Sequence, residues 1–390
     1  MSLKKKILFT CHSYNNFQKD PIDLVSSNFD TVSVLVRYNP IAEFSRYIPL
    51  PFLNRYNLSY KIDLKNKPSN LNVYPTPVLY ASFDSKDRRL GEKNFKAAEK
   101  VIEQNNIEFD IIHSHFTWSS GYVGAKLSKK YDVPFVVTAH GYDIYDLPFR
   151  DKAWRKSIED VLNDANCILT VSKSNLDCIN ELDVESPVKI ISNGYRSDLF
   201  YPKDPNACKN SLNLPTNKKI ILSVGNLETI KGHKYLIESV SEVVKWRKDI
   251  LCVIVGGGKL WKKLNQQIKK NNLDKYVLLT GEKPHDEIPI WMNACDVFVL
   301  PSIRESFGVV QIEAMACKKP IVATHNGGSG GILISEDYGF LVEPENSAEL
   351  AKMILLALNK NWNADKIYTY SKKFALDNIK HELISIYNNL

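Results

Sequence analysis

The stretch LPSIRESFGVVQIEAMA, residues 300–316, joins the end of a short apolar run to a segment with helical periodicity. Pro301 stops the preceding strand, and Ser306 has the residue type that caps a helix beginning at Phe307. The first amides of such a helix have no acceptor within it and lie at the positive end of the helix dipole. The stretch therefore predicts a strand, a loop and a helix whose amino end can hold a diphosphate.

The same alternation extends in both directions from this stretch. Short β-branched apolar runs alternate with longer stretches of helical period, which is typical of parallel strands joined by crossover helices. The expected strands are 6–10, 31–36, 110–113, 134–138, 167–171, 189–191, 219–224, 251–255, 276–280, 296–300 and 320–324. The expected helices are 93–104, 119–130, 152–163, 234–245, 259–270, 307–316, 348–358 and 365–387. The fold class is therefore α/β.

The length and a change in composition predict two domains. A chain of 390 residues exceeds what one hydrophobic core usually serves, and the polar stretch 203–218 separates two series of strands. We place an N-terminal domain at 1–203 and a C-terminal domain at 204–362. The final helical segment, 363–390, can pack on either domain and cross back to the first. A cleft between two such domains is a natural place for a ligand.

Composition excludes several classes of protein. Seven cysteines without a C-x-x-C pair indicate reduced thiols rather than disulfides or a zinc site. The apolar runs are too short for a transmembrane helix, and the basic start lacks a signal-peptide core, so we expect a cytoplasmic protein. The net charge of +7 is spread along the chain. It favours nucleotide phosphates or an anionic membrane as partners, and without a recognisable motif nucleic acid ranks last.

One segment, 37–60, has a different composition from the rest of the first half. Its aromatic residues and prolines interleave with Arg37, Arg46 and Arg55. It is either a packed surface excursion or an interfacial patch. The second reading predicts peripheral contact with the inner membrane face or with a lipid-linked acceptor.

Two carboxylates flank the start of the expected helix at 307–316. Glu305 lies in the loop before it and Glu313 about two turns into it, so both can accept hydrogen bonds from hydroxyl groups of one ligand. Acidic residues are also favourable near any helix amino end. The pair alone therefore does not decide between a ligand site and simple helix stabilisation.

The wider pattern does decide between them. From Ile220 onward the chain resembles the retaining glycosyltransferases of family 4, the group 1 glycosyltransferases, whose motif P-S-x-x-E-x-F-G-x-x-x-x-E-A-M-A is supplied by residues 301–316. Further matching stretches are SVGNL (223–227) with Lys231-Gly232, VGGG (255–258), DVFVL (296–300), PIVAT (320–324) with Gly327-Gly328, and GFLV (339–342). In the first half they are DIIHSHF (110–116), PFVVTAHG (134–141) and SNG (192–194).

The resemblance implies a GT-B fold, in which two Rossmann-like domains face each other across a cleft. It also implies roles for single residues: Glu313 binds the ribose of a nucleotide-sugar donor, Glu305 the transferred sugar and Lys231 the diphosphate. His140, after an apolar strand, would contact the donor sugar or its reacting face. His140, Glu305 and Lys231 are thus the expected catalytic residues. His113 and His115 are assigned mainly to structural roles.

The expected ligand contacts follow from the same resemblance. The residues expected to bind the donor are Gly225, Asn226, Lys231, Gly257, Gly281, Arg304, Glu305, Ser306, Phe307, Gly308, Val309 and Glu313. The loop 281–285 is expected near the base. On the acceptor side we expect His12, Tyr14, Gly141 and Asn193.

The chain departs from the family at several positions. Asn226 replaces an arginine that usually pairs with the lysine on the diphosphate, and Arg304 can supply the second positive charge. Gly331 replaces a common glutamate, and Lys319 a common glycine. The usual glycine-rich loop after the first strand is replaced by residues 11–17. These changes bear on the donor and above all on the acceptor.

The sequence therefore predicts a retaining glycosyltransferase that moves a sugar from a nucleotide-sugar donor to a glycan or lipid-linked acceptor, in surface polysaccharide or glycoconjugate assembly. We expect no cofactor and no obligatory metal, because no D-x-D follows an apolar strand. Trp261 stands where a dinucleotide motif needs its third glycine, which argues against a nicotinamide or flavin enzyme. A sugar-nucleotide epimerase and a degenerate, non-catalytic scaffold are the alternatives.

Overall fold

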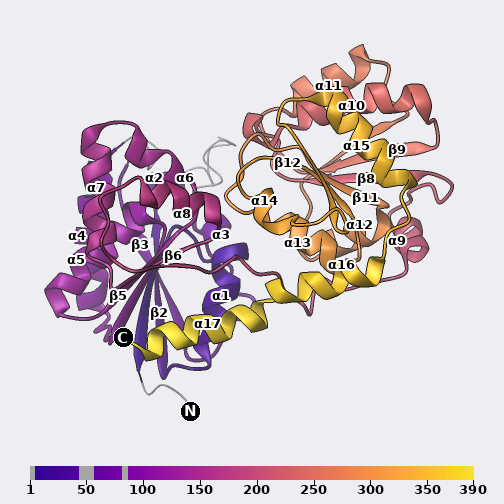
Figure 1. The fold of residues 1–390 in the computed structure, drawn as a ribbon. Coiled ribbons are helices and arrows are strands. Elements are labelled where there is room, and N and C mark those ends of the chain that lie inside the picture. Colours follow the sequence, from indigo (N-terminus) through magenta and orange to yellow (C-terminus); the bar gives the residue numbers. More distant parts are fainter. Residues whose placement is uncertain (1–4, 44–56, 81–86) are drawn as a thin grey trace. The chain divides into compact units, whose positions relative to one another are not determined.

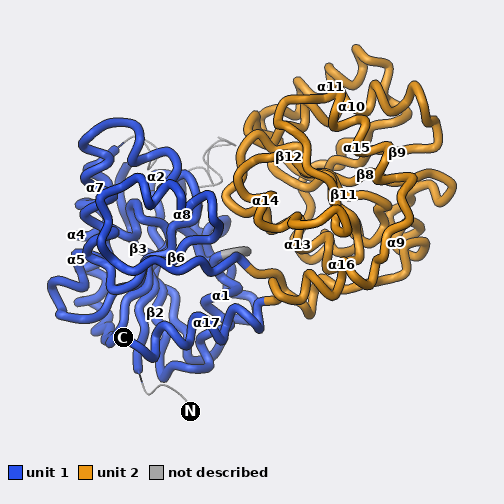
Figure 2. The backbone as a smooth tube through the Cα atoms, viewed as in Figure 1, with its two compact units in different colours: residues 1–193, 376–390 blue, residues 194–375 orange. Residues whose placement is uncertain are grey.

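A computed structural model describes residues 5–43, 57–80 and 87–390. The chain divides into two compact units (Figure 2): residues 1–193 with 376–390, and residues 194–375. The sequence had placed the division after residue 203. Residues 194–203 lie with the second unit, where the amide of Tyr195 donates to the carbonyl of Phe374 and the side chain of Asn293 bonds the backbone of Tyr201 and Lys203.

Unit 1 contains a parallel sheet covered by helices on both faces (Figure 1). Its strands, in spatial order, are β3 (Leu71–Pro77), β2 (Thr31–Tyr38), β1 (Lys6–Cys11), β4 (Ile111–His115), β5 (Phe135–Ala139), β6 (Cys167–Thr170) and β7 (Val188–Ile190). Its helices are α1 (Asn16–Ser26), α2 (Pro40–Glu43), α3 (Leu58–Lys61), α4 (Arg89–Gln104), α5 (Tyr122–Tyr131), α6 (Tyr142–Tyr145), α7 (Lys152–Asn163), α8 (Lys173–Asn180) and α17 (Leu376–Asn388). The central strands are buried along their length, as strands covered on both faces must be.

The two faces of this sheet are covered by helices from different parts of the chain. The helices α4, α5 and α7 enclose one core, and α1 with the C-terminal α17 encloses the other. Tyr387 of α17 is fully buried, and its hydroxyl lies 2.6 Å from Nδ1 of His113 on β4. The end of the chain is therefore part of the core of unit 1.

Unit 2 contains a second parallel sheet. Its strands, in spatial order, are β10 (Val277–Gly281), β9 (Ile250–Val255), β8 (Lys219–Val224), β11 (Val297–Leu300), β12 (Ile321–Thr324) and β13 (Gly339–Val342). Its helices are α9 (Pro205–Ser211), α10 (His233–Trp246), α11 (Trp261–Lys270), α12 (Ile288–Ala294), α13 (Val309–Ala316), α14 (Ser329–Ile332), α15 (Ser347–Asn359) and α16 (Ala364–Ser371). The apolar sides of α10, α11 and α15 pack over one face of the sheet.

Both sheets have the doubly wound strand order of Rossmann folds. The order reverses between β1 and β4 in unit 1 and between β8 and β11 in unit 2. In such sheets ligands bind beyond the carboxyl ends of the strands at this reversal. The α/β class with two Rossmann-like units is therefore confirmed, and each unit has a defined place for a ligand.

The expected start of the helix at 307–316 is wrong by two residues. The helix α13 begins at Val309, and Gly308 with φ +87° precedes it in place of the predicted cap, Ser306. A left-handed φ suits glycine and few other residues, so the chain turns at Gly308 before the helix can start. The expected 365–387 helix is likewise two helices, α16 and α17, separated by residues 372–375.

The expected interfacial patch lies mostly outside the described residues, which omit 44–56. Arg37, within the described residues, does not belong to such a patch. It is 5% exposed on β2, its Nη1 donates to Oγ of Ser119 over 3.2 Å, and its guanidinium lies over the ring of Tyr80. Arg37 is a core residue because both faces of β2 are covered. Along the described residues, no helix is both long and apolar enough to cross a membrane.

Candidate active site

Lys231 and Glu305 meet at the reversal point of unit 2. Lys231 ends a short turn after β8, and Glu305 lies in the loop after β11, the neighbouring strand. The Nζ atom of Lys231 lies 2.5 Å from Oε1 of Glu305. The same oxygen accepts a hydrogen bond from Oγ of Ser302 over 2.9 Å. The two loops thus place a cation and a carboxylate side by side where a ligand is expected.

The close approach of these two loops depends on Gly232. Its φ is +68°, and a Cβ atom at this position would lie 1.9 Å from the carbonyl oxygen of Pro301. The amide of Ile303 also donates to the carbonyl of Ile230 over 2.8 Å. Glycine directly after Lys231 is therefore what lets the lysine reach the β11 loop.

A third loop, after β12, supports Glu305 from the other side. The amide of Glu305 donates to the carbonyl oxygen of Asn326 over 2.8 Å. The side-chain oxygen of Asn326 accepts from the amides of Gly328 and Ser329. Gly328 packs against the backbone of Phe307, which directly precedes Gly308. Three loops at the carboxyl ends of adjacent strands therefore fix the approach to helix α13.

Glu313 is held by a histidine that the sequence did not single out. Glu313 is 4% exposed, and its Oε1 lies 3.0 Å from Nε2 of His285, which follows β10. A carboxylate only accepts hydrogen bonds, so Nε2 of His285 carries the donated proton. The ring of Phe200 lies 5.3 Å from the ring of His285. His285 ends the 281–285 loop that the sequence placed near the base, but nothing in its spacing indicated Glu313 as its partner.

The remaining expected donor residues lie on the same edge of unit 2, with different environments. The loops of Gly225, Gly257 and Gly281 are joined by backbone hydrogen bonds from Leu227 to Gly257 and from Gly256 to Gly281. The side chain of Phe307 is buried against Phe374. Arg304 is exposed on the loop of Glu305, and its expected role as a second cation stays a prediction. The expected contact of Asn226 with the donor likewise stays a prediction.

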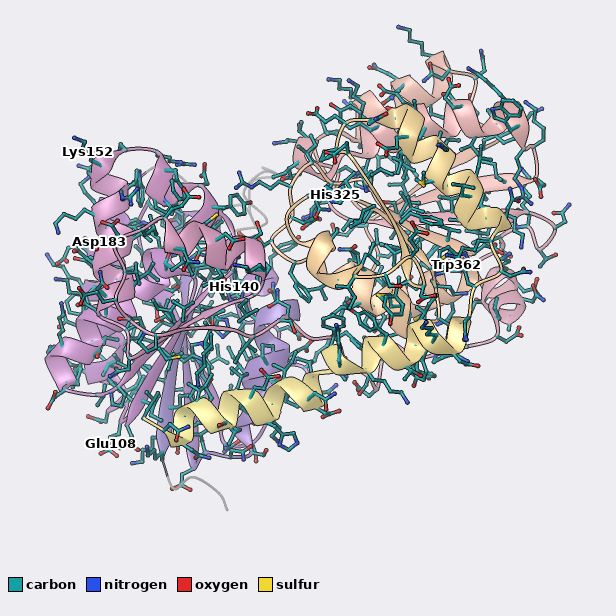
Figure 3. The ribbon with its side chains drawn as sticks, in the orientation of Figure 1. Glu108, His140, Lys152, Asp183, His325 and Trp362 are labelled. Atoms are coloured by element: carbon teal, nitrogen blue, oxygen red, sulfur yellow. The ribbon has the colours of Figure 1, made fainter. Side chains whose placement is uncertain are left out.

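In unit 1, His140 directly follows β5 (Figure 3), and its buried side chain lies among other aromatic rings. Its ring stacks on His115 with centroids 5.1 Å apart and lies 4.8 Å from the ring of Phe116. Phe116 in turn stacks on His12, which follows β1, at 4.6 Å. Burial holds the pKa of His140 well below its ordinary value, so the imidazole is neutral at pH 7. The neutral ring can donate and accept hydrogen bonds, but it does not act as a general acid at pH 7.

A buried carboxylate shapes the loop that follows His140. Asp143 is fully buried and accepts hydrogen bonds from the amides of Gly141 and Thr117, each over 2.7 Å. Burial raises the pKa of Asp143 to about 6. Asp143 thus links the turn after β5 to the turn after β4, a role that cannot be read from the sequence because it depends on amides from two separate turns.

The other residues expected on the acceptor side differ in their surroundings. Tyr14 is fully buried, and its hydroxyl donates to Asp23 of α1, so it belongs to the core of unit 1 rather than to a binding surface. Asn193 is the last residue of unit 1 before the chain enters unit 2. In the described ranges, no cluster of three or more His, Cys, Asp or Glu side chains is arranged to hold a metal ion.

Comparison with known proteins assigns the family. Residues 205–374 match the family described as glycosyl transferases group 1, and residues 59–199 match glycosyltransferase family 4. An uncharacterized glycosyltransferase of Methanocaldococcus jannaschii is 30% identical over 300 residues, which cover 76% of this chain and 79% of the relative. The chain belongs to the group 1 glycosyltransferases.

Two further comparisons concern a relative in sequence and a solved structure of similar fold. A putative teichuronic acid biosynthesis glycosyltransferase of Bacillus subtilis is 29% identical over 261 residues, which cover 66% of this chain and 64% of the relative. The crystal structure of the Anabaena protein HepE in complex with UDP-glucose matches with a TM-score of 0.74 at 22% identity, covering 99% of this chain and 100% of that chain. The GT-B fold expected from the sequence is confirmed. The group 1 glycosyltransferases are nucleotide-sugar transferases, as the motifs had indicated.

Proposed function

We propose that this group 1 glycosyltransferase transfers a hexosyl or N-acetylhexosaminyl group from a nucleotide-sugar donor to a hydroxyl of a glycan or lipid-linked acceptor, with retention of the anomeric configuration. The pairing of Lys231 with Glu305 beside the amino end of α13 carries the proposal. A cation and free helix amides suit a diphosphate, and a carboxylate beside them suits sugar hydroxyls. Glu313, further along the same helix, then accepts from the ribose.

The reaction follows from these positions. The bond between the anomeric carbon and the diphosphate oxygen breaks, and negative charge grows on the leaving diphosphate. Lys231 and the helix amides stabilise that charge. The acceptor hydroxyl forms the new bond on the face that the diphosphate leaves, and its proton passes to an oxygen of the diphosphate. His140 serves as a neutral hydrogen-bonding contact to the sugar.

No protein nucleophile is required in this scheme. Retaining hydrolases place two carboxylates roughly 5 Å apart on either side of the sugar. Here Glu305 is engaged by Lys231 and Glu313 by His285, at different points along one helix and its preceding loop. The family assignment also disfavours the epimerase alternative. A glycosyltransferase moves the sugar to an acceptor, whereas an epimerase would leave the sugar on its nucleotide.

We further propose that the reaction needs no metal, since Lys231 and the α13 amides supply the positive charge that a cation would otherwise bring. Donor turnover should then be unaffected by a chelator. A loss of turnover that added magnesium restores would overturn this part of the proposal.

The proposed setting is the assembly of a surface polysaccharide or glycoconjugate. The Bacillus relative is named for teichuronic acid biosynthesis, which supports a polymer or lipid-linked acceptor. An acceptor of that kind would bring the protein to the inner membrane face.

A nucleotide-release screen tests the function. Purified protein is incubated with UDP-, GDP- and ADP-sugars, and the released nucleoside diphosphate is measured for wild type, Lys231→Ala and Glu305→Gln. Lys234→Ala is the control, because Lys234 is an exposed lysine three residues from Lys231 that pairs with Glu238. Release from one donor that both site variants lose and the control keeps supports the proposal. No release and no thermal shift with any donor would indicate a non-catalytic scaffold.

A further inference from the structure

The buried carboxylate of Glu313 depends on one hydrogen-bond donor. Glu313 lies on α13 and is 4% exposed, and its Oε1 lies 3.0 Å from Nε2 of His285. Within the described part of the chain, no other hydrogen bond to this carboxylate is made. The direction of the bond is fixed by chemistry, because a carboxylate has no proton to give and the imidazole must donate. His285 therefore supplies the bond that offsets the cost of burying this charge.

His285 is itself held by its surroundings. It follows β10 and lies shortly before α12, and its carbonyl accepts from the amide of Ile288 at the start of that helix. The helix α12 packs against α13, so the backbones that carry the imidazole and the carboxylate are fixed to each other. The ring of Phe200, which is 1% exposed, lies 5.3 Å from the ring of His285. The imidazole thus has a defined position from which to direct the carboxylate.

This one hydrogen bond determines which part of Glu313 a ligand can use. The terminal torsion of a glutamate side chain is broad, so an unsupported carboxylate turns readily. Such a turn would break the bond between Oε1 and His285. The carboxylate is therefore held in one orientation, with Oε2 left for a ligand. An acceptor that is already oriented binds a hydroxyl at a smaller loss of side-chain entropy than one that must be ordered on binding.

The position of His285 connects two parts of the expected nucleotide site. It ends the loop 281–285, which the sequence placed near the base, and the carboxylate that it holds is the one expected at the ribose. Its side chain is 36% exposed, so it lies where the core of unit 2 meets the surface. A nucleoside with its base against this loop would bring its ribose towards the oriented carboxylate.

We propose that His285 is a positioning residue for nucleotide recognition, which donates to Oε1 of Glu313 and so orients Oε2 to accept from the ribose hydroxyls of a nucleoside diphosphate. The proposal rests on the ribose contact of Glu313 in the proposed function and deepens it. The preference of this site for a ribonucleotide over its dideoxy form then depends on His285. Because the ribose is bound alike before and during transfer, loss of His285 should raise KM and leave kcat nearly unchanged.

The first test measures nucleotide affinity by calorimetric titration. UDP, GDP and ADP are compared on wild type, and the nucleotide that binds best is used throughout. His285→Phe keeps a ring beside Phe200 but has no donor, and it should weaken binding by about 10-fold. His285→Gln, whose amide nitrogen can take the place of Nε2, should recover most of the affinity. Wild-type affinity in His285→Phe, or no recovery in His285→Gln, would overturn the proposal.

The second test uses the 2′,3′-dideoxy form of the same nucleotide, which separates positioning from general damage to the loop. His285→Phe should bind this analogue as wild type does, because the hydroxyls that Glu313 would hold are absent. Combining His285→Phe with Glu313→Gln should weaken ribonucleotide binding no more than Glu313→Gln alone, since one residue acts through the other. Additive losses, or an equal penalty with the dideoxy analogue, would show that His285 does not act through Glu313.

Donor turnover and a control variant complete the test. His285→Phe should raise the donor KM by about 10-fold with little change in kcat. His381→Phe, at an exposed histidine of α17 in unit 1, should match wild type in affinity and turnover. Wild-type affinity in Glu313→Gln, or no binding of any of the three nucleotides to wild type, would overturn the proposed function itself. Weak binding by Glu313→Gln together with wild-type binding by His285→Phe would overturn the positioning role alone.

Discussion

The ammonium of Lys231 lies 2.5 Å from Oε1 of Glu305, although 73 residues separate them in the chain. They meet because β8 and β11 are neighbours at the strand reversal, so the loops that follow them share one edge of the sheet. The side chains are 29% and 12% exposed, so the pair is accessible but partly shielded from water. In the proposed function a donor engages both groups at once, the phosphates at Lys231 and the sugar at Glu305.

Lys231→Ala should lower donor turnover by about 100-fold, because the charge that stabilises the leaving diphosphate is lost. Its effect on stability should be small, since a part-exposed ion pair contributes little to folding. Initial rates and thermal unfolding of both proteins measure the two effects. Lys234→Ala serves as the control and should match wild type in both. Equal rates for Lys231→Ala and Lys234→Ala would show that Lys231 does not contribute to donor turnover.

Glu313→Gln should weaken nucleoside diphosphate binding by about 10- to 100-fold, because a hydrogen bond to a charged acceptor is worth about 1.5–3 kcal/mol. Calorimetric titration with UDP, GDP and ADP measures the affinity. The penalty should disappear with 2′,3′-dideoxy analogues, which lack the ribose hydroxyls. Glu336→Gln, at an exposed carboxylate of the same unit, is the control. A penalty that persists with the dideoxy analogues would show that Glu313 does not read the ribose.

Much of unit 2 could be predicted from the sequence because its signals are local. The apolar runs of β11 and β12 are buried from end to end and those of β8 and β9 over most of their length, and the bounds of all four agree with prediction within a residue. The start of α13 could not be predicted in the same way. Ser306 has the cap residue type, but the left-handed turn at Gly308 and its contacts with the β12 loop determine where the helix begins.

Elements without a strong local signal were missed. β3 contains Pro75 and Pro77 and lies at the edge of the sheet, where missing amide donors are tolerated, so its sequence does not read as a strand. α1 contains Pro21 within its length, which argues against a helix when read alone. Both are stabilised by contacts with distant parts of the chain, and α1 packs with α17 from the other end of the sequence.

The site itself was predicted by residue type but not by partner. The motif named Glu305, Glu313 and Lys231, yet spacing cannot show that Lys231 contacts Glu305 or that His285 contacts Glu313. Asp143 was not recognised at all, because its role depends on two backbone amides from different turns. Pairwise contacts of this kind arise only once the strand order is set.

Gly328→Ala should destabilise unit 2 and reduce donor turnover. A Cβ atom at residue 328 would lie 2.6 Å from the backbone nitrogen of Phe307. Because backbone cannot rotate away as a side chain can, the segment that precedes α13 must shift. We expect a loss of about 1–3 kcal/mol in the free energy of unfolding. Urea denaturation and initial rates measure the two effects.

Gly330→Ala is a matched control for this substitution. It lies two residues further on, within α14, and a Cβ atom there would meet no atom within 4 Å. Alanine favours helix over glycine, so this variant should be neutral or slightly more stable. Similar behaviour of the two variants would show that the contact between Gly328 and Phe307 does not hold the α13 loop in place.

The stability of unit 1 should fall as the pH rises from about 4 to about 6 because of Asp143. Burial raises its pKa to about 6, from 3.8 in the unfolded chain. As the pH rises, the unfolded chain therefore loses its proton first, and the folded state becomes relatively less favourable until its own carboxyl ionises. The shift of about two units corresponds to about 3 kcal/mol. The contribution of Asp143 to the free energy of unfolding is fully present below pH 4 and is lost by about pH 6. Above that pH it does not change further.

The comparison that isolates this effect is wild type against Asp143→Asn, by urea denaturation from pH 4 to 8. The contributions of ionisable groups common to both proteins cancel. The unfolding free energy of wild type minus that of Asp143→Asn should therefore drop between pH 4 and 6 and then stay constant. Asp151→Asn is the control. Hydrogen bonds from the amides of residues 153 and 154 help to lower the pKa of Asp151, so its difference from wild type should not fall with rising pH. A level difference for Asp143→Asn across the whole range would mean that its carboxyl ionises as readily when folded as when unfolded.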